Sequence, residues 1–228
     1  IGTSGVKALL IRPDGAAIGE ASAALDVSRP HPGWSEQDPA QWWDAVLKAT
    51  DQLAQSHPEA MAGLDGIGLS GQMHGATLLD ADNNVIRPAI LWNDGRASAE
   101  CAELEAALPQ SRDIAGNIAM PGFTAPKLLW VKKHEPDNFA RVAKVLLPKD
   151  YVRFRLAGTF ASDMSDAAGT LWLDVGRRDW SDMLLAATGL GRAHMPDLVE
   201  GTQPTGRLDA GLAARWAMAD RPVVAGGA

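Results

Sequence analysis

A single histidine lies in the stretch SGQMHG, residues 70–75, directly after the short apolar run GIGL. Crevices for small ligands form where strands end in open α/β sheets, so His74 is a candidate ligand contact. Gly71 and Gly75 would let a ligand come close to the backbone there. Taken alone, a lone histidine at such a position is more often a hydrogen-bonded structural residue, and with no second His or Cys nearby a metal site is not indicated.

The stretch LWNDGR, residues 91–96, places further polar side chains directly after a second apolar segment. Asn93 and Asp94 can bond hydroxyl groups while the indole of Trp92 covers an apolar face, which is the make-up of a polyol site. The alternative is an Asp-Gly turn followed by an exposed arginine, and the residues alone leave both interpretations open.

Two other stretches carry weaker signals. GTSGVK, residues 2–7, presents Thr3 and Ser4 between glycines, where backbone amides can bind an anion, but it also fits a plain tight turn and is not a Walker A sequence. Asp163 and Asp166 are a pair of carboxylates, and such a pair can serve in general acid and base catalysis. Their alternation with serine favours capping of turns and helix starts instead.

Local patterns predict an α/β domain with a mixed sheet flanked by helices, which would position these side chains. Residues 6–11 and 16–25 form a hairpin around an Asp-Gly turn. The clearest helix begins with Asp38 as N-cap and Pro39 as its first residue. Further strands are expected within residues 64–71, 76–80, 85–92 and 222–227, and further helices at 97–108, 125–134, 136–142, 149–156, 180–188 and 209–217.

Composition excludes several classes of partner and location. The 228 residues are 46% hydrophobic and 21% charged, as expected of one globular unit. A net charge of -7 provides no broad cationic surface, so neither nucleic acid nor a membrane is an expected partner. Cys101 is the only cysteine, which rules out an internal disulfide and a Cys-based metal site and fits a reducing compartment. With no membrane-length apolar run and no signal-peptide pattern, we expect a cytoplasmic protein.

Seven stretches, in their order along the chain, resemble the FGGY family of carbohydrate kinases: GTSGVK, WSEQDPAQWW, GQMHGATLLD, LWNDGR, GFTAPKLLW, LLPKDYVRFRLAG and SDMSDAAGTLWLD. The resemblance extends along essentially the whole chain, and the segment from Gly122 to His134 fits the family's signature of Lys, an apolar residue and Trp at fixed spacing. It implies a ribonuclease-H-like domain of the actin and hexokinase ATPase type. In that family the first of two such domains binds mainly the sugar and the second mainly ATP.

Within the family, the stretches are most similar to those of kinases that act on D-xylulose. The resemblance implies transfer of the γ-phosphoryl group to O5 of D-xylulose, with ATP and Mg²⁺ as cofactors. Carried over residue by residue, it implies sugar contacts at Gln72, Met73 and His74, a second wall of Trp92, Asn93 and Asp94, and a phosphate loop at Thr3 and Ser4.

Two carboxylates that the family uses are not found in the sequence. Ile1 occupies the apolar position after the family's Mg-organising Asp, and the general-base Asp is expected just beyond Ala228. We therefore expect residues 1–228 to be the N-terminal sugar-binding domain, without the nucleotide-binding domain and without a catalytic residue, so that the chain alone is inactive.

Two other interpretations remain open. A kinase of the same family that acts on ribulose, L-xylulose or gluconate would share these stretches. A non-catalytic pentose-binding module would instead bind sugar without ATP. The resemblance leaves a homodimer open as the assembly.

Overall fold

A computed structural model describes residues 1–218, 221–224 and 226. The strands are β1 (Gly5–Ile11), β2 (Ala17–Ala24), β3 (Glu36–Gln37), β4 (Ile67–Gly68), β5 (Thr77–Leu79), β6 (Ala89–Ile90), β7 (Lys144–Leu146), β8 (Ala161–Asp163), β9 (Leu173–Asp174), β10 (Asp179–Trp180), β11 (Asp197–Val199), β12 (Pro204–Arg207) and β13 (Pro222–Val224). The helices are α1 (Pro39–Ser56), α2 (Pro58–Ala62), α3 (Ser98–Ala107), α4 (Ser111–Ala115), α5 (Thr124–His134), α6 (Pro136–Ala140), α7 (Pro148–Ala157), α8 (Met164–Ala168), α9 (Asp182–Thr188), α10 (Ala210–Arg215) and the short 3-10 helix η1 (Arg192–His194).

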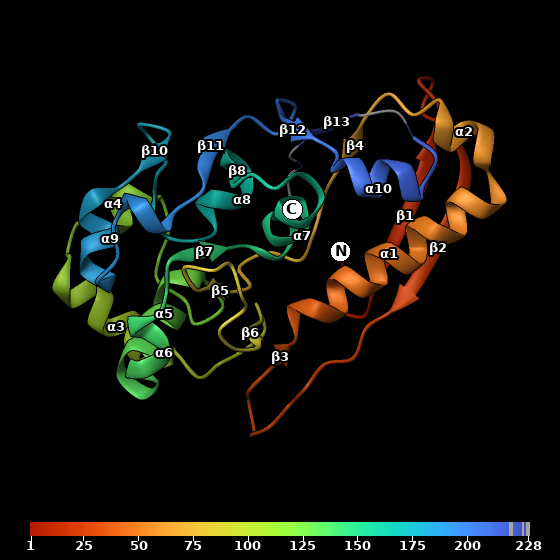
Figure 1. Ribbon diagram of the computed structural model, residues 1–228. Coiled ribbons are helices and arrows are strands. Elements are labelled where there is room, and N and C mark those ends of the chain that lie inside the picture. Colours follow the sequence, from red (N-terminus) through yellow and green to blue (C-terminus); the bar gives the residue numbers. More distant parts are fainter. Residues whose placement is uncertain (219–220, 225, 227–228) are drawn as a thin grey trace.

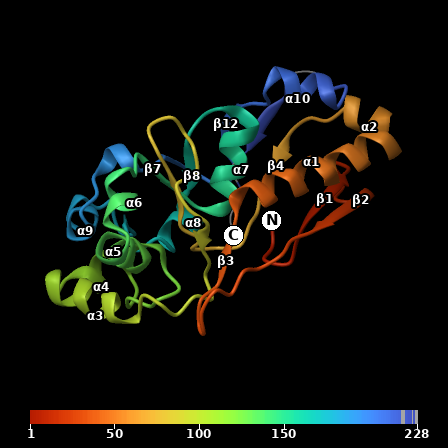
Figure 2. The same cartoon turned by 60° about the horizontal axis from the view of Figure 1, so that its bottom comes forward.

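Two hydrophobic clusters form the core. The first joins the β1–β2 hairpin to α1, α7 and α10 and includes the buried indoles of Trp42 and Trp216. The second joins β5 to α3, α5 and α9 and includes Leu78, Leu128 and Trp172. In Figure 1 the second group of elements lies on the left, and the first extends from α7 in the middle to the hairpin on the right, an order that Figure 2 also shows. The N-terminus lies between α7 and α1 in the view of Figure 1, and Ile1 bonds to the backbone of Ser70 and Gln72.

Helix α1 shows how the sequence determines an element. The Asp38 carboxylate accepts a hydrogen bond of 2.9 Å from the Ala40 amide. Pro39 has no backbone N–H, so no donor is left unbonded at the first position of the helix. One face, which includes Trp42 and Leu53, is buried against the hairpin. The helix ends at His57, whose amide bonds to the Leu53 carbonyl. The predicted helix is confirmed.

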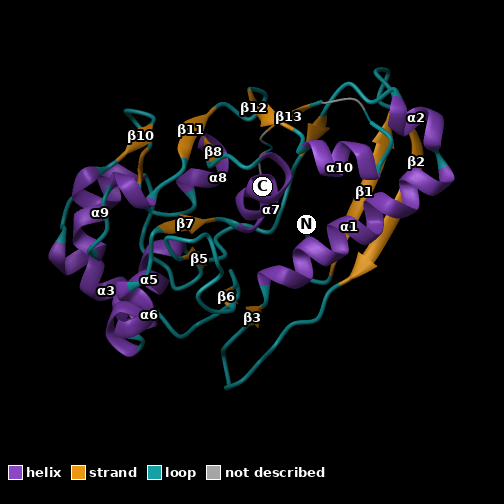
Figure 3. Ribbon diagram, in the orientation of Figure 1, coloured by secondary structure: helices purple, strands orange, loops and turns teal. Residues whose placement is uncertain are grey.

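The sheet is divided into short pieces among the described residues (Figure 3). The hairpin strands β1 and β2 are antiparallel, whereas β13 pairs in parallel with β4 and antiparallel with β12. The predicted mixed α/β class is confirmed. Outside the hairpin most strands have only two or three residues, because polar turns interrupt each apolar run.

The six further predicted helices are confirmed as α3, α5, α6, α7, α9 and α10, with small shifts of their ends. Helix α9 begins later than predicted, because residues 179–180 pair with β9 and the Ser181 side chain caps the helix. Helices α2, α4 and α8 have five residues each and were not predicted, since one turn of helix shows no apolar period. Of the predicted strand at 222–227, β13 covers the first half, and residues 225 and 227 lie outside the described part. Among the described residues, no helix is both long and apolar enough to cross a membrane.

Candidate functional site

Three stretches that are far apart in the sequence meet through a chain of polar side chains. The Trp92 indole donates to the Thr3 hydroxyl at 3.0 Å, and that hydroxyl donates to the Gln72 side-chain oxygen at 2.9 Å. Gln72 in turn donates to the buried Gln37 amide oxygen at 2.8 Å. The Ile1 carbonyl also accepts from the Gln72 backbone amide at 2.7 Å. The structure thus brings together the turn at residues 2–5 and the two predicted walls of the sugar site. The first wall is residues 72–74, and the second wall is residues 92–94.

Gln37 was not predicted as part of the site, although it uses every hydrogen-bonding group of its amide there. Its oxygen accepts from Gln72 and from the Trp42 indole, and its nitrogen donates to the carbonyls of Thr3 and Asp26. Thr3 and Gln72 are 34 and 35 residues away, so no local pattern could have revealed these two bonds. Gln37 fixes the N-terminal turn relative to α1 and the Gln72 wall.

His74 has one ring nitrogen bonded to the protein and one that is not. Its Nδ1 lies 2.8 Å from the Gly169 carbonyl oxygen. A carbonyl oxygen only accepts, so Nδ1 must carry the hydrogen and neutral His74 leaves its Nε2 lone pair as an acceptor. Phe123 packs edge-on against the ring with 4.6 Å between centroids. Nε2 has no hydrogen-bond partner among the residues that the structure describes.

The electrostatic surroundings of His74 keep its ring neutral. Burial, together with the charge of Lys127, lowers the pKa of His74 to about 4, and the bond to Gly169 opposes this shift. At neutral pH the ring is therefore uncharged, and Nε2 can accept a hydrogen bond from a hydroxyl group of a ligand.

The His74 backbone is held in an unusual conformation. Its φ of 64° lies in the left-handed region, which costs a non-glycine residue roughly 1–2 kcal/mol. Two donors fix its carbonyl oxygen: the Thr124 hydroxyl at 3.2 Å and the Lys127 amino group at 2.8 Å. Such conformations persist only where the surroundings determine them, which is a feature of functional sites.

The glycines on either side of the 72–74 stretch pack closely against α7. A Cβ atom on Gly75 would lie 2.6 Å from Pro148, and one on Gly71 would lie 3.0 Å from the Lys149 side chain. These positions therefore allow close packing of the 70–75 stretch against the start of α7. The approach of a ligand to their backbone stays a prediction.

The exposed predicted residues can contact a ligand, whereas Asp94 is placed differently. Met73 and Trp92 are 37% and 44% exposed, and Asn93 is also exposed. Asp94 is only 2% exposed, and each of its oxygens accepts two hydrogen bonds, from Arg96 and from backbone amides including that of Ser35. Asp94 holds the 91–96 loop, and its direct contact with a ligand stays a prediction that these bonds disfavour.

Thr3 and Ser4 lie in a tight turn that the Gly2 amide closes on the Gly5 carbonyl at 2.9 Å. The Thr3 hydroxyl is engaged by Trp92 and Gln72, while Ser4 is exposed. The turn is confirmed. Contact of these hydroxyls with a phosphate group stays a prediction.

A buried ionic cluster supports the site from behind. The Lys149 amino group lies 2.6 Å from Asp150, 2.8 Å from Asp163 and 3.1 Å from Asp166, and all four side chains are 1% exposed. Asp163 also caps α8, as its sequence context indicated, but Asp166 pairs with Lys149 rather than capping. At the other end of α8, Gly169 bonds to His74. The cluster therefore anchors the helix that orients the histidine.

Replacing Asp166 by asparagine is expected to weaken the dependence of stability on pH. Burial raises the pKa of Asp166 to about 7, above its ordinary value of 3.8, while Lys149 opposes this shift and Asp150 adds to it. The contribution of the protonated Asp166 carboxyl to the free energy of unfolding is fully present below the pKa that this group has in the unfolded chain. It is lost as the pH rises through the pKa that the group has in the folded protein.

Urea unfolding checks this expectation. The free energy of unfolding should fall by at most about 1.4 kcal/mol per pH unit between about pH 4 and 7 in the wild type, and less in Asp166→Asn. Asp65→Asn changes an exposed carboxylate and should behave like the wild type. An equal fall in Asp166→Asn and wild type would contradict the assigned shift.

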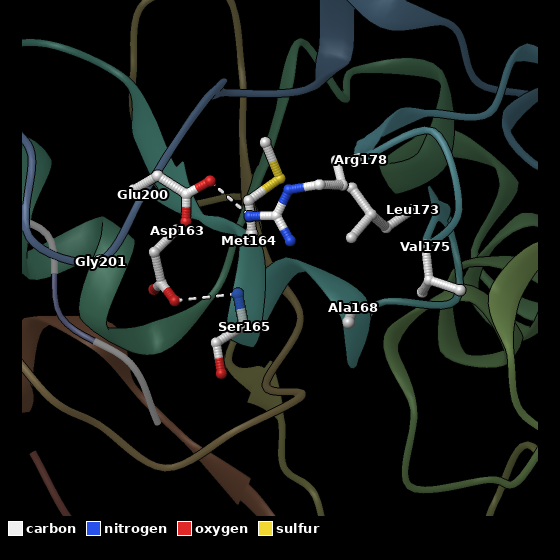
Figure 4. Close-up of a pocket in the computed structure, with 9 residues that line it drawn as sticks. All are labelled: Asp163, Met164, Ser165, Ala168, Leu173, Val175, Arg178, Glu200 and Gly201. Atoms are coloured by element: carbon white, nitrogen blue, oxygen red, sulfur yellow. Dashed lines mark hydrogen bonds and ion pairs between the residues drawn. The ribbon is translucent and has the colours of Figure 1, made fainter.

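A separate cavity of about 360 Å³ opens beside α8 (Figure 4). Arg178 and Glu200, which line it, form an ion pair with each other, and the Asp163 carboxylate accepts from the Ser165 amide. None of the predicted sugar contacts lines this cavity. We therefore assign the candidate site to the strand-end stretches around His74 and not to the cavity.

Comparisons with known proteins match the chain along its whole length. Residues 1–228 match the N-terminal domain of the FGGY family of carbohydrate kinases. The xylulose kinase of Escherichia coli (strain K12) is 58% identical over 227 residues, which are 100% of the chain and 46% of that protein. The chain thus spans about half the length of the curated relatives it matches.

Solved structures show the same fold. A structure described as a "xyloylose kinase" from Brucella ovis has a TM-score of 0.98 and 59% identity, and the match covers 100% of the chain and 47% of that protein. The xylulose kinase of Rhodospirillum rubrum has a TM-score of 0.93 and 31% identity, over 100% of the chain and 47% of that protein. The fold is that of sugar kinases of the actin and hexokinase ATPase type, as predicted.

Proposed function

The chain belongs to the FGGY family of carbohydrate kinases, and from this premise we propose that it is the sugar-binding half of a kinase that transfers the γ-phosphoryl group of ATP to O5 of D-xylulose. Relatives that are 58% and 56% identical over 100% of the chain are named xylulose kinases, which supports this choice of sugar. The observation that carries the proposal is the neutral ring of His74, whose Nδ1 is bonded to Gly169 and whose Nε2 is therefore a fixed acceptor beside the exposed residue Met73 in the sequence.

Each predicted contact has a distinct part in this proposal. Nε2 of His74 accepts a hydrogen bond from a sugar hydroxyl, and the Trp92 indole covers an apolar face of the sugar. Asn93 supplies an exposed amide that can donate and accept. Gln72 holds Thr3 and so sets the distance between the sugar wall and the N-terminal turn. Catalysis of phosphoryl transfer depends mainly on such positioning.

The described residues do not fit a magnesium ion. No group of three or more His, Cys, Asp or Glu side chains in the described ranges is arranged to hold a metal. Where three carboxylates do converge, the amino group of Lys149 lies among them. We therefore assign no step to Mg²⁺ or ATP within this chain. The general base beyond Ala228, the separate nucleotide-binding domain, the homodimer and the cytoplasmic location stay predictions.

Phosphorylation of a sugar panel tests the proposed function. The protein that carries this chain together with the second half found in its relatives should release ADP fastest with D-xylulose, and more slowly with L-xylulose, D-ribulose, gluconate and glycerol. A higher kcat/KM for ribulose, L-xylulose or gluconate would assign another sugar within the family. Sugar binding by calorimetry without any release of ADP would instead support a non-catalytic pentose-binding module.

A further inference from the structure

Lys127 is a fully buried lysine whose partners are two carbonyl oxygens. Its side chain is 0% exposed, and its amino group lies 2.8 Å from the His74 carbonyl and 2.7 Å from the Gly122 carbonyl. No carboxylate lies within ion-pair distance of this amino group among the described residues. Burial holds the pKa of Lys127 well below its usual range, against the charge of Asp94 and together with that of Arg96. Burial of such a group is costly, so its placement calls for a specific reason.

The two carbonyls belong to the two walls of the candidate site. His74 lies in the first wall, and the bond to Lys127 fixes its carbonyl in the left-handed conformation with φ of 64°. Gly122 packs directly against the second wall, because a Cβ atom on it would lie only 2.5 Å from the Trp92 carbonyl oxygen. One amino group on α5 therefore connects the backbone that carries His74 to the backbone that packs on Trp92.

We propose that Lys127 is a positioning residue of the sugar site: it sets the separation of the His74 wall and the Trp92 wall and the direction of the His74 ring, without touching the sugar itself. This inference rests on the proposed function for the identity of the sugar, but the arrangement of the walls is independent of it. Thr124, the other donor to the His74 carbonyl, supports that carbonyl from the same helix at the longer distance of 3.2 Å.

Substitution of Lys127 by methionine tests this role. Methionine has a similar length but donates no hydrogen bond, so the two walls should separate and the KM for the sugar should rise by at least about fivefold, with the KM for ATP unchanged within about twofold. Lys127→Gln keeps a donor and removes the charge, so it should show a smaller rise. Lys132→Met removes an exposed lysine from the same helix and should leave both KM values at their wild-type level.

Titration of His74 by NMR in the sugar-free protein is the second readout. Besides burial and the Gly169 carbonyl, Lys127 is the group that shifts the pKa of His74. Both Lys127→Met and Lys127→Gln should therefore raise that pKa from about 4 toward its ordinary value of 6.5, whereas Lys132→Met should not. This readout does not depend on which sugar is phosphorylated, so it tests the coupling of Lys127 to His74 even if the proposed function fails.

The sugar KM and the pKa of His74 together decide whether Lys127 positions the site. A folded Lys127→Met protein with a sugar KM within about twofold of wild type and an unchanged pKa of His74 would overturn the proposal. If Lys127→Met does not fold, Lys127→Gln takes its place, because its amide can still bond one carbonyl. Wild-type values for both readouts in Lys127→Gln would then overturn the proposal.

Discussion

Replacement of His74 by alanine should lower kcat/KM for D-xylulose by at least about tenfold, which corresponds to about 1.4 kcal/mol of transition-state stabilisation. The loss is expected because Nε2 is an acceptor in a fixed position. Its direction is set by the Nδ1 bond to Gly169 and by the Phe123 ring. A hydroxyl that loses this partner inside a partly buried site is left without a hydrogen bond.

Two further substitutions at the same position distinguish contact from structure. The amide nitrogen of His74→Asn can replace Nδ1 as donor to Gly169, and asparagine tolerates the left-handed backbone, but this variant has no group at the position of Nε2. It should fold normally and lose as much activity as His74→Ala. The oxygen of His74→Gln can replace Nε2 and should restore part of the activity. His31→Ala changes an exposed histidine and serves as the control. A loss below about twofold in His74→Asn would show that His74 is structural.

Replacement of Gly169 by alanine is expected to have a comparable effect without any change to His74. The backbone of Gly169, with φ of -72°, suits alanine, so strain in the main chain does not arise. Its Cβ atom would lie 2.4 Å from Cε1 and 2.5 Å from Nδ1 of His74, so the ring must move and lose its bond to the Gly169 carbonyl. Overpacking of this kind typically costs about 1–3 kcal/mol of stability.

Kinetics and thermal unfolding together check this prediction. Gly169→Ala should lower kcat/KM for the sugar by about tenfold and lower the melting temperature by a few degrees, while the KM for ATP stays near its wild-type value. Gly191→Ala adds a methyl group where no atom lies within 4 Å and should change neither quantity. Wild-type sugar kinetics in Gly169→Ala would show that the direction of the His74 ring has no effect on the reaction.

The elements that were predicted from the sequence are those with strong local signals. Helix α1 has a capping Asp38, a Pro39 and a repeating apolar face, and the hairpin has an Asp-Gly turn, so both follow from neighbouring residues. Helix α8 is too short to show a period, although it links the buried Lys149 cluster to His74. Its role becomes visible only through contacts between distant stretches.

Only those parts of the candidate site that have a local sequence signal were predicted. His74, Met73 and Trp92 follow apolar runs, which is a local signal, and the structure places them among stretches that meet. Gln37 bonds to Thr3 and Gln72, 34 and 35 residues away, and Lys127 bonds to His74, 53 residues away, so these contacts depend on tertiary structure. Asp94 shows the reverse case: its sequence context fits a sugar contact, but Arg96 two residues later engages its carboxylate.

The most direct test of the proposed sugar site is the NMR signal of His74 Nε2 in ¹⁵N-labelled protein that carries this chain together with the second half found in its relatives. Without sugar at neutral pH, Nδ1 should be protonated and Nε2 should show the shift of an unprotonated nitrogen, because burial lowers the pKa of His74 to about 4. Addition of D-xylulose should move the Nε2 chemical shift toward that of an unprotonated nitrogen that accepts a hydrogen bond. The Nδ1 chemical shift should stay nearly unchanged. Saturating D-xylulose that is phosphorylated normally but does not move the Nε2 signal would contradict the assignment of His74 as a sugar contact.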